Sequence, residues 1–364
     1  MSGSRRWLTT AKVALVACGA ATAAVVMTGA LASPRQPAPP APATSPGPTP
    51  AAAAAAAAAK GSVVRILPGT SLSSVRVKAG TTYEFAAGAQ YTGTLDVSAD
   101  DVTVQSYGSG SAPVLTRHAQ GSDIVVSGTG DTVRSLQVTG QGYDGKNGYI
   151  IGVGVTGRDD TITQISAYGD LYAGVYFEQA SSAGTVSHSI IDHCDALNPQ
   201  HLSSGAFGVL LWGTRNTVED NTIKNQVTTS PVYGTDGSAV EVYHGRDNII
   251  RDNTGSNDTA FTELGGAGAT GNSYIGNTFT GPGDFLITRG SGDKVNGPVL
   301  NTIVTRNRAD GEIVSYDWRP GNGTLLTLAG NTITMPGKIA LWTDGGYVND
   351  GGNTFTGKII KSGH

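Results

Sequence analysis

The chain has 364 residues, of which 52 are glycine and 14% are charged, and its formal net charge is −4. A nucleic-acid-binding protein carries a basic face or stripe, and the sequence shows none, so we expect no nucleic-acid partner. The mildly acidic balance says little about the substrate, and the function has to be inferred from the sequence patterns.

Residues 1–32 predict an export signal. Arg5 and Arg6 lie in a positive N-terminal region, about 20 apolar residues follow, and Ala30-Leu31-Ala32 is a small-residue cleavage signal. We therefore expect a secreted, extracellular protein without stable membrane insertion after cleavage. Three alternatives remain open: an uncleaved membrane anchor, twin-arginine export through Arg5 and Arg6, and a surface lipoprotein attached at Cys18.

The segment that follows predicts a tether and then one domain. Residues 33–60 are rich in proline and end in an alanine run, which favours a disordered spacer. Residues 61–364 form the domain, and without Cys18 its only cysteine is Cys194, so no internal disulfide would form and the core must hold the fold. Its first strand-like segments should cover the N-terminal end of the fold: Val63–Leu67, Ser74–Val77 and Thr82–Phe85.

A short pattern recurs along the domain. Its copies are 24 to 32 residues apart and begin at residues 101, 131, 160, 184, 216, 248 and 272. A period in this range indicates stacked supersecondary units. Short runs of Val, Ile, Thr, Phe and Tyr between Gly, Asn and Asp predict strands and turns without helices. We therefore predict an all-β fold, a parallel β-solenoid.

One repeat shows the plan of a coil. Ala239–Tyr243 alternates apolar and polar residues and predicts a strand with one buried face. After a turn, Asn248–Arg251 predicts a second strand, and Asp252-Asn253 predicts a tight bend in which asparagine takes the left-handed conformation. A third short strand closes the coil, and we expect about ten coils of three strands each. The bend asparagines should stack in a hydrogen-bonded ladder: Asn221, Asn253, Asn277, Asn307, Asn331 and Asn353.

Three strands per coil, with a two-residue bend that holds Asn between the second and third, resemble the right-handed parallel β-helix of the pectate-lyase-like superfamily. The opening resembles the same superfamily in Val77–Phe85, Tyr91-Thr92-Gly93 and Val102–Tyr107. The resemblance covers about residues 61–364 and implies a right-handed β-helix with a polysaccharide as partner, although fold and activity separate readily. We expect a monomer.

The first strands of successive coils define a solvent-facing surface, because alternate residues of a strand face outward. Moving the strand Phe261–Leu264 by one residue would place Glu263 beside Glu241, and the sequence leaves both registers open. In the register without this shift, Glu241 and Phe261 lie in a column beside the main one. The main outward column then holds Glu178, Trp212, Tyr243, Glu263, Thr288, Tyr316 and Trp342.

This surface suits a polysaccharide, because aromatic rings stack on the apolar faces of sugars, and solenoids offer extended surfaces. The alternative is that like residues of neighbouring coils stack only for stability. We expect the loop 192–201 to form a wall of the groove. The alternatives are an inert loop or a transition-metal site made by His193, Cys194, Asp195 and His201. The predicted substrate-binding residues are Glu178, Tyr176, Trp212, Tyr243, Tyr316, Trp342, His193 and His201.

Glu241 and Glu263 form the predicted catalytic centre. In consecutive coils their carboxyl groups would lie roughly 5–9 Å apart, which spans both glycosidase geometries. With Asp236 they could instead hold Ca²⁺, which would neutralise a uronic acid carboxylate and acidify its C5 proton. Elimination then needs a base, for which Arg289, His244, Tyr243 and Tyr316 are candidates. The remaining alternative is a pair of solvated glutamates without a role.

We therefore expect a secreted, carbohydrate-active protein. The first hypothesis is a polysaccharide lyase that cleaves a uronic-acid polymer by β-elimination, with Glu241, Glu263, His244 and Arg289 as catalytic residues. A glycoside hydrolase that uses Glu241 and Glu263 is the alternative enzyme, and a glycan-binding solenoid or a purely structural repeat protein are the alternatives without catalysis. Polygalacturonase activity is not expected, because only Gly234-Thr235-Asp236-Gly237 resembles the motifs of those enzymes.

Overall fold

The computed structural model describes residues 61–142, 149–194, 206–230, 234–266, 268–289, 299–316, 318, 321 and 323–362, with the main chain alone at Ser230 and Arg289. The predicted export signal 1–32, the tether 33–60 and His201 lie outside these ranges. Within them, no helix is both long and apolar enough to cross a membrane.

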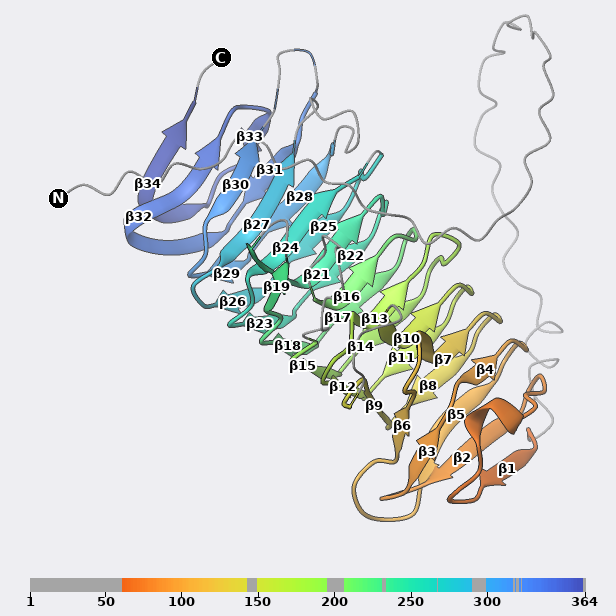
Figure 1. Ribbon diagram of the computed structural model, residues 1–364. Coiled ribbons are helices and arrows are strands. Elements are labelled where there is room, and N and C mark those ends of the chain that lie inside the picture. Colours follow the sequence, from red (N-terminus) through yellow and green to blue (C-terminus); the bar gives the residue numbers. More distant parts are fainter. Residues whose placement is uncertain are drawn as a thin grey trace, which may run out of the picture. The chain divides into compact units, whose positions relative to one another are not determined.

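The described chain is almost entirely β-strand, wound coil upon coil into a solenoid (Figure 1). Strands of neighbouring coils pair in parallel, for example β21 with β24 and β22 with β25. The three strand positions of a coil define three faces, which we call the first, second and third face. The predicted parallel β-helix with three strands per coil is therefore confirmed.

The first face consists of β4 (Leu95–Val97), β7 (Gly121–Val126), β10 (Ile150–Val155), β13 (Ala173–Phe177), β16 (Phe207–Leu211), β21 (Ser238–Tyr243), β24 (Ala260–Gly265), β27 (Asp284–Arg289) and β30 (Ile313–Tyr316). The third face consists of β3 (Gln90–Thr92), β6 (Val114–Thr116), β9 (Gln137–Thr139), β12 (Ser166–Tyr168), β15 (Ile190–Asp192), β18 (Thr222–Lys224), β23 (Thr254–Ser256), β26 (Thr278–Thr280) and β29 (Arg308–Ala309). Two long strands, β32 (Thr332–Thr343) and β34 (Thr354–Lys361), continue from the third face into the first, so both faces belong to one sheet of 20 strands.

The second face is a separate sheet of 12 strands. It consists of β1 (Val63–Ile66), β2 (Thr82–Ala86), β5 (Thr103–Tyr107), β8 (Thr132–Arg134), β11 (Thr161–Thr163), β14 (Thr185–Ser187), β17 (Thr217–Glu219), β22 (Ile249–Arg251), β25 (Ser273–Ile275), β28 (Thr302–Thr305), β31 (Leu326–Ala329) and β33 (Tyr347–Asn349). Outside the three faces, β19 (Thr228–Ser230) and β20 (Gly234–Asp236) form an antiparallel hairpin between β18 and β21.

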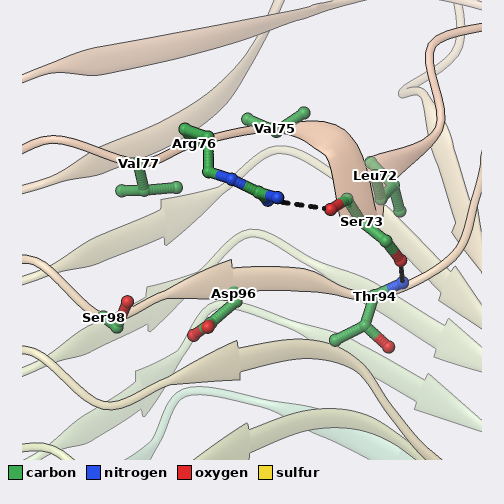
Figure 2. Close-up of a pocket in the computed structure, with 8 residues that line it drawn as sticks. All are labelled: Leu72, Ser73, Val75, Arg76, Val77, Thr94, Asp96 and Ser98. Atoms are coloured by element: carbon green, nitrogen blue, oxygen red, sulfur yellow. Dashed lines mark hydrogen bonds between the residues drawn. The ribbon is translucent and has the colours of Figure 1, made fainter.

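The N-terminal end of the core is covered by a 3-10 helix, η1 (Leu72–Ser74), and not by a strand at Ser74–Val77 as predicted. Leu72 is fully buried, because it fills the open end of the stack. The N–H of Val75 donates to the Leu72 carbonyl at 3.0 Å, which closes the turn where a strand would need a partner chain. Figure 2 shows the pocket of about 300 Å³ beside η1, lined by Leu72, Ser73, Val75, Arg76, Val77, Thr94, Asp96 and Ser98.

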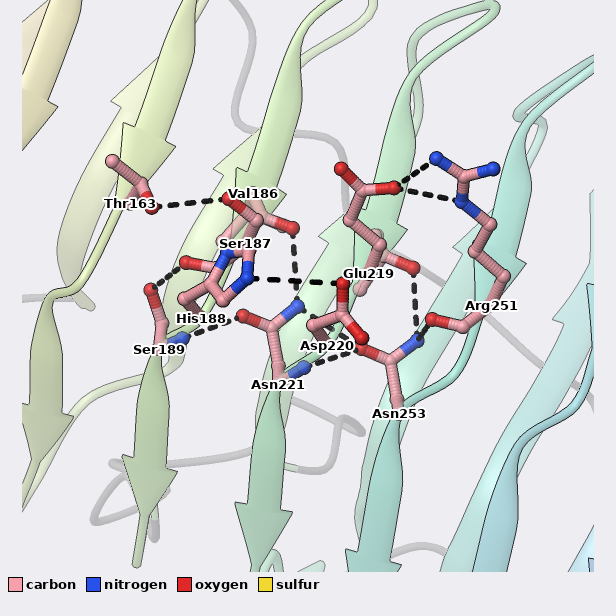
Figure 3. A network of polar contacts seen from close by, with 11 residues as sticks. Thr163, Val186, Ser187, His188, Ser189, Glu219, Asp220, Asn221, Arg251 and Asn253 are labelled. Atoms are coloured by element: carbon pink, nitrogen blue, oxygen red, sulfur yellow. Dashed lines mark hydrogen bonds and ion pairs between the residues drawn. The ribbon is translucent and has the colours of Figure 1, made fainter.

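The predicted asparagine ladder runs along the bend between the second and third faces (Figure 3). From Asn221 to Asn331, each main-chain N–H donates to the Oδ1 atom of the next ladder asparagine at 2.8–3.1 Å. The left-handed residue is not the asparagine, as predicted, but the one before it, with φ 53° at Asp220 and 55° at Asp252. The asparagine side chain is thereby free to point inward and reach the next coil.

Candidate functional site

Glu241 and Glu263 lie beside each other on the outward side of the first face. Strands β21 and β24 pair with Glu241 opposite Glu263, one strand spacing or about 4.8 Å apart at Cα. Both side chains are partly buried. Of the two registers that the sequence leaves open, the structure has the shifted one, and the placement of Glu263 in the column of Tyr243 is wrong because the partner of Tyr243 is Gly265.

The register differs because Phe261 points into the core. Its ring stacks on Phe285 with centroids 5.2 Å apart, and a Cβ on Gly255 would lie 2.5 Å from it, so glycine makes the room. The next residue, Thr262, is also fully buried, and its hydroxyl lies 2.8 Å from the hydroxyl of Tyr274. Two consecutive inward residues break the strict alternation of a strand, so the outward position falls on Glu263.

Two other members of the predicted column are elsewhere. Thr288 is fully buried and therefore faces the core. Trp342 pairs with Val314, which belongs to the column of Glu241 and not to that of Tyr316. The rings of Tyr316 and Trp342 still stack diagonally, with centroids 6.3 Å apart and planes at 23°.

An aromatic group borders the glutamate pair. Trp212 follows β16, and its ring meets that of Tyr243 edge-on at 5.7 Å. His244 adopts a left-handed conformation with φ 60°, and its ring stacks on Trp212 at 5.5 Å. These three rings, together with Tyr316 and Trp342, are partly buried. Aromatic rings therefore lie on both sides of the glutamate pair along the stack.

A second cluster on the outward side of the first face was not predicted. Phe207 and Leu210 of β16 are 6% and 5% exposed, although Leu210 pairs directly with the outward Glu241. The ring of Tyr172 stacks on Tyr149 at 4.1 Å and meets Phe207 edge-on at 5.2 Å. The predicted substrate-binding Tyr176 packs against this cluster, and burial raises the pKa of its hydroxyl. The apolar run Phe207–Leu211 is the sequence signal for a strand buried on both sides.

Several carboxyl groups of the first face are shifted toward the neutral form. Burial raises the pKa of Glu178, a predicted substrate-binding residue. Burial and the nearby Glu312 raise the pKa of Asp284 to about 7, and burial also raises that of Glu312. Asp284 pairs with Ala260 at the start of β27, so it lies on the same face as Glu263. Asp284 and Glu312 were not predicted, because Asp284 is the first residue of β27 and Glu312 directly precedes β30.

Glu241 is held by a buried hydroxyl. Ser238, at the start of the same strand, is 2% exposed and donates to Glu241 Oε2 at 2.9 Å. A donor to a carboxylate stabilises its ionised form. The sequence did not predict this contact, because residues three apart in a regular strand point to opposite faces.

Asp236 is the third residue of the predicted Ca²⁺ site and lies in the hairpin before β21. It ends β20, its Oδ1 accepts from the N–H of Gly237 at 2.8 Å, and burial raises its pKa. Among the described residues, no group of three or more His, Cys, Asp or Glu side chains could hold a metal ion. That Asp236, Glu241 and Glu263 hold Ca²⁺ stays a prediction, and we assign no step to the ion.

The remaining predicted residues lie at different places. His193 follows β15 on the third face, is exposed, and contacts Asp192, whose carboxylate also accepts from Asn225 at 2.7 Å. Arg289 ends β27, opposite Tyr316 of the next coil, so its main chain lies on the first face. His201 lies outside the described residues. The first face thus brings together the two glutamates, His244, Trp212, Tyr243, Tyr316 and Trp342.

Neither a protein-family model nor a curated protein matches the sequence, whereas solved structures do. A tailspike protein mutant of E. coli bacteriophage HK620, in complex with a pentasaccharide, matches with a TM-score of 0.55 and 14% identity over 72% of this chain and 52% of that chain. DFA-IIIase from Arthrobacter chlorophenolicus A6 matches with a TM-score of 0.55 and 12% identity over 78% of this chain and 77% of that chain. Alginate lyase from Paenibacillus sp. str. FPU-7 matches with a TM-score of 0.46 and 15% identity over 78% and 92%.

These likenesses show the fold. The neighbours are right-handed β-helices, and this chain is a right-handed parallel β-helix like them, so the predicted resemblance to the pectate-lyase-like superfamily is confirmed for the architecture. The chain spans about half the length of the tailspike protein.

Proposed function

We propose that the protein binds a polysaccharide along the outward side of the first face and hydrolyses it between Glu241 and Glu263. The observation that carries the proposal is the direct pairing of these two partly buried glutamates in adjacent strands. Like charges directly opposite each other destabilise a sheet. A catalytic pair accounts for this cost, because glycosidic cleavage needs two carboxyl groups at a fixed separation.

The geometry favours a retaining mechanism. Side chains that run parallel from Cα atoms about 4.8 Å apart hold their carboxyl groups near 5 Å, which is the separation of retaining glycosidases. The Ser238 bond favours ionised Glu241, which then attacks the anomeric carbon. Glu263 donates its proton to the leaving glycosidic oxygen. In the second step Glu263 takes a proton from water, and that water oxygen displaces Glu241 from the sugar.

The aromatic residues give the glycan its binding surface. Trp212 lies one coil before Glu241, and Tyr316 lies two coils after Glu263. Successive coils are about 4.8 Å apart, which is close to the length of one sugar in a chain. A glycan that runs along the stack would therefore meet an aromatic ring on each side of the bond that is cleaved. Both neighbours with a TM-score of 0.55 are carbohydrate-active, which supports this choice of substrate.

β-Elimination on a uronic-acid polymer is the second candidate. It is favoured by the placement of His244 against Trp212 and of the Arg289 main chain on the same face. We rank it second because the direct pairing of Glu241 with Glu263 supplies the two carboxyl groups that glycosidic hydrolysis needs, whereas elimination needs a single base.

The experiment is a screen of neutral and acidic polysaccharides in water enriched in ¹⁸O, with and without chelator. Hydrolysis places one heavy oxygen at each new reducing end. Elimination places none there and gives a product with a new C=C bond that absorbs in the ultraviolet. If unsaturated products form, and chelator prevents their formation, the hydrolysis proposal is wrong and the lyase mechanism takes its place. Binding without turnover on every polysaccharide would leave a glycan-binding solenoid.

A further inference from the structure

A second polar ladder runs along the bend between the first and second faces. The main-chain N–H of Asn216 donates to Asn248 Oδ1 at 2.9 Å. In earlier coils the same position is taken by aspartate, and the N–H of Asp131 donates to Asp160 Oδ1 at 2.9 Å. The same bond from N–H to Oδ1 thus occurs with Asp in the earlier coils and with Asn in the later ones. Gly184 takes the position between Asp160 and Asn216, and its N–H donates to Asn216 Oδ1 at 2.9 Å.

Each ladder side chain has a second polar atom, Nδ2 in asparagine and Oδ2 in aspartate. Its position is given by its distance from a Cβ built on the glycine three residues earlier. A Cβ on Gly245 would lie 2.7 Å from Asn248 Nδ2. A Cβ on Gly157 would lie 2.4 Å from Asp160 Oδ2. The same relation holds at Gly128, where the distance to Asp131 Oδ2 is 2.5 Å. Oδ2 of each aspartate thus occupies the place of an amide nitrogen.

That place requires a hydrogen-bond donor. Asn248 Nδ2 donates to the carbonyl of Gly213, in the preceding coil, at 3.3 Å. At Asp160 the corresponding carbonyl is that of Gly128, and it lies within 2.4 Å of the same Gly157 Cβ position as Asp160 Oδ2. Two acceptor oxygens, Gly128 O and Asp160 Oδ2, therefore lie near the same point, where Asn248 has a donor beside an acceptor. Within the described structure Asp160 Oδ2 has no hydrogen-bond partner, and Asp131 Oδ2 has none of good geometry, although the N–H of Gly128 lies near the Asp131 carboxyl. Both side chains are 1% exposed.

The surrounding charges also oppose ionisation. Asp100 and Asp101 face Asp131, and Asp131, Asp159 and Asp100 face Asp160. Burial first, and then these carboxylates, raise the pKa of Asp131 to about 6 and that of Asp160 to about 7. Main-chain donors lower both values, but by less than burial raises them.

We propose that Asp131 and Asp160 are neutral carboxylic acids in the folded protein, with Oδ2–H donating to the preceding coil as an asparagine amide does. The N-terminal coils then lose stability as the pH rises from about 4 to about 7. In the unfolded chain both groups ionise near the ordinary value of 3.8, whereas in the folded protein they hold their protons to higher pH. The stability that Asp131 and Asp160 contribute is therefore fully present below about pH 4. It falls as the pH rises through about 6 to 7 and does not change further above that.

The test compares thermal unfolding of the full chain with that of Asp131→Asn/Asp160→Asn between pH 4 and pH 8. Asparagine supplies the donor without a titrating proton, so we expect the double variant to melt higher than the wild type at pH 8. At pH 4 the difference should become small. Some pH dependence remains in the variant, since Asp258 at another bend also has a raised pKa, of about 8.

Asp247→Asn is the matched control. Asp247 is exposed and precedes the ladder residue Asn248, and asparagine tolerates its left-handed φ of 56°, so this variant should keep the wild-type dependence on pH. The reverse change, Asn248→Asp, should introduce a new loss of stability at pH 8. Infrared spectra near pH 5 should show a buried protonated carboxyl band that is weaker in the double variant. Equal pH dependence in the double variant and the wild type, or an unchanged carboxyl band, would overturn the proposal.

Discussion

Asn277 offers a quantitative test of the asparagine ladder. Its Oδ1 accepts from the N–H and the Nδ2 of Asn253 at 3.0 and 3.1 Å, and its Nδ2 donates to Ile250 O at 2.9 Å and to Asn307 Oδ1 at 3.0 Å. Asn277→Ala removes all four bonds and leaves the buried N–H of Asn253 without its partner. An orphaned buried donor costs about 1–3 kcal/mol and each of the three further bonds about 1 kcal/mol, so we expect the free energy of unfolding to fall by about 4–6 kcal/mol.

The assay is urea denaturation followed by circular dichroism, with Asn353→Ala as the matched control. Asn353 makes the same contacts to Asn331, at 2.9 Å, but ends the ladder and is partly exposed. Water can replace its bonds, so its loss should cost about 1 kcal/mol. Equal losses in the two variants, or a loss below about 1 kcal/mol at Asn277, would refute the role of the buried ladder.

Three further predictions concern the first face. Phe261→Ala should lower the free energy of unfolding by about 3–5 kcal/mol, because the ring is fully buried against Phe285; a loss below about 1 kcal/mol in urea denaturation would contradict the inward register. Trp212→Ala should weaken glycan binding, measured by calorimetry, about tenfold or more with little change in melting temperature; the opposite pattern would mean that the ring serves packing alone. Asp284→Asn should raise the melting temperature at pH 8 but not at pH 4, because the raised pKa of about 7 makes the wild type lose stability as Asp284 ionises; an equal shift at both pH values would contradict the buried carboxylic acid.

The repeat pattern was sufficient to predict the architecture. Strand segments at a constant period can bury their apolar residues only by stacking, so the three faces and the ladder from Asn221 to Asn353 follow from spacing alone. The register of β24 does not follow in this way. Alternation identifies the outward residue only where the strand is regular, and the buried pair Phe261 and Thr262 interrupts it.

Side-chain contacts that form only in the folded chain account for the residues that the sequence did not reveal. Asp131 and Asp160 begin two copies of the repeat and resemble ordinary turn residues, and only the structure places them on a buried ladder with Asn216 and Asn248. The Ser238 contact to Glu241 depends on the local path of the strand, which composition does not determine. Aspartate in a turn and serine at the start of a strand are both common, so the sequence alone did not single out Asp131, Asp160 or Ser238.

The central claim is that Glu241 and Glu263 cleave a glycan bound on the first face. The most direct measurement is the turnover rate of Glu241→Gln and Glu263→Gln on the best polysaccharide of the screen, with binding measured in parallel. The control is Glu219→Gln, on the second face, where the side chain pairs with Arg251. We expect each active-face variant to lose at least about 100-fold in rate while still binding the glycan. Turnover at the wild-type rate in Glu241→Gln and Glu263→Gln, as in the control Glu219→Gln, would contradict the claim.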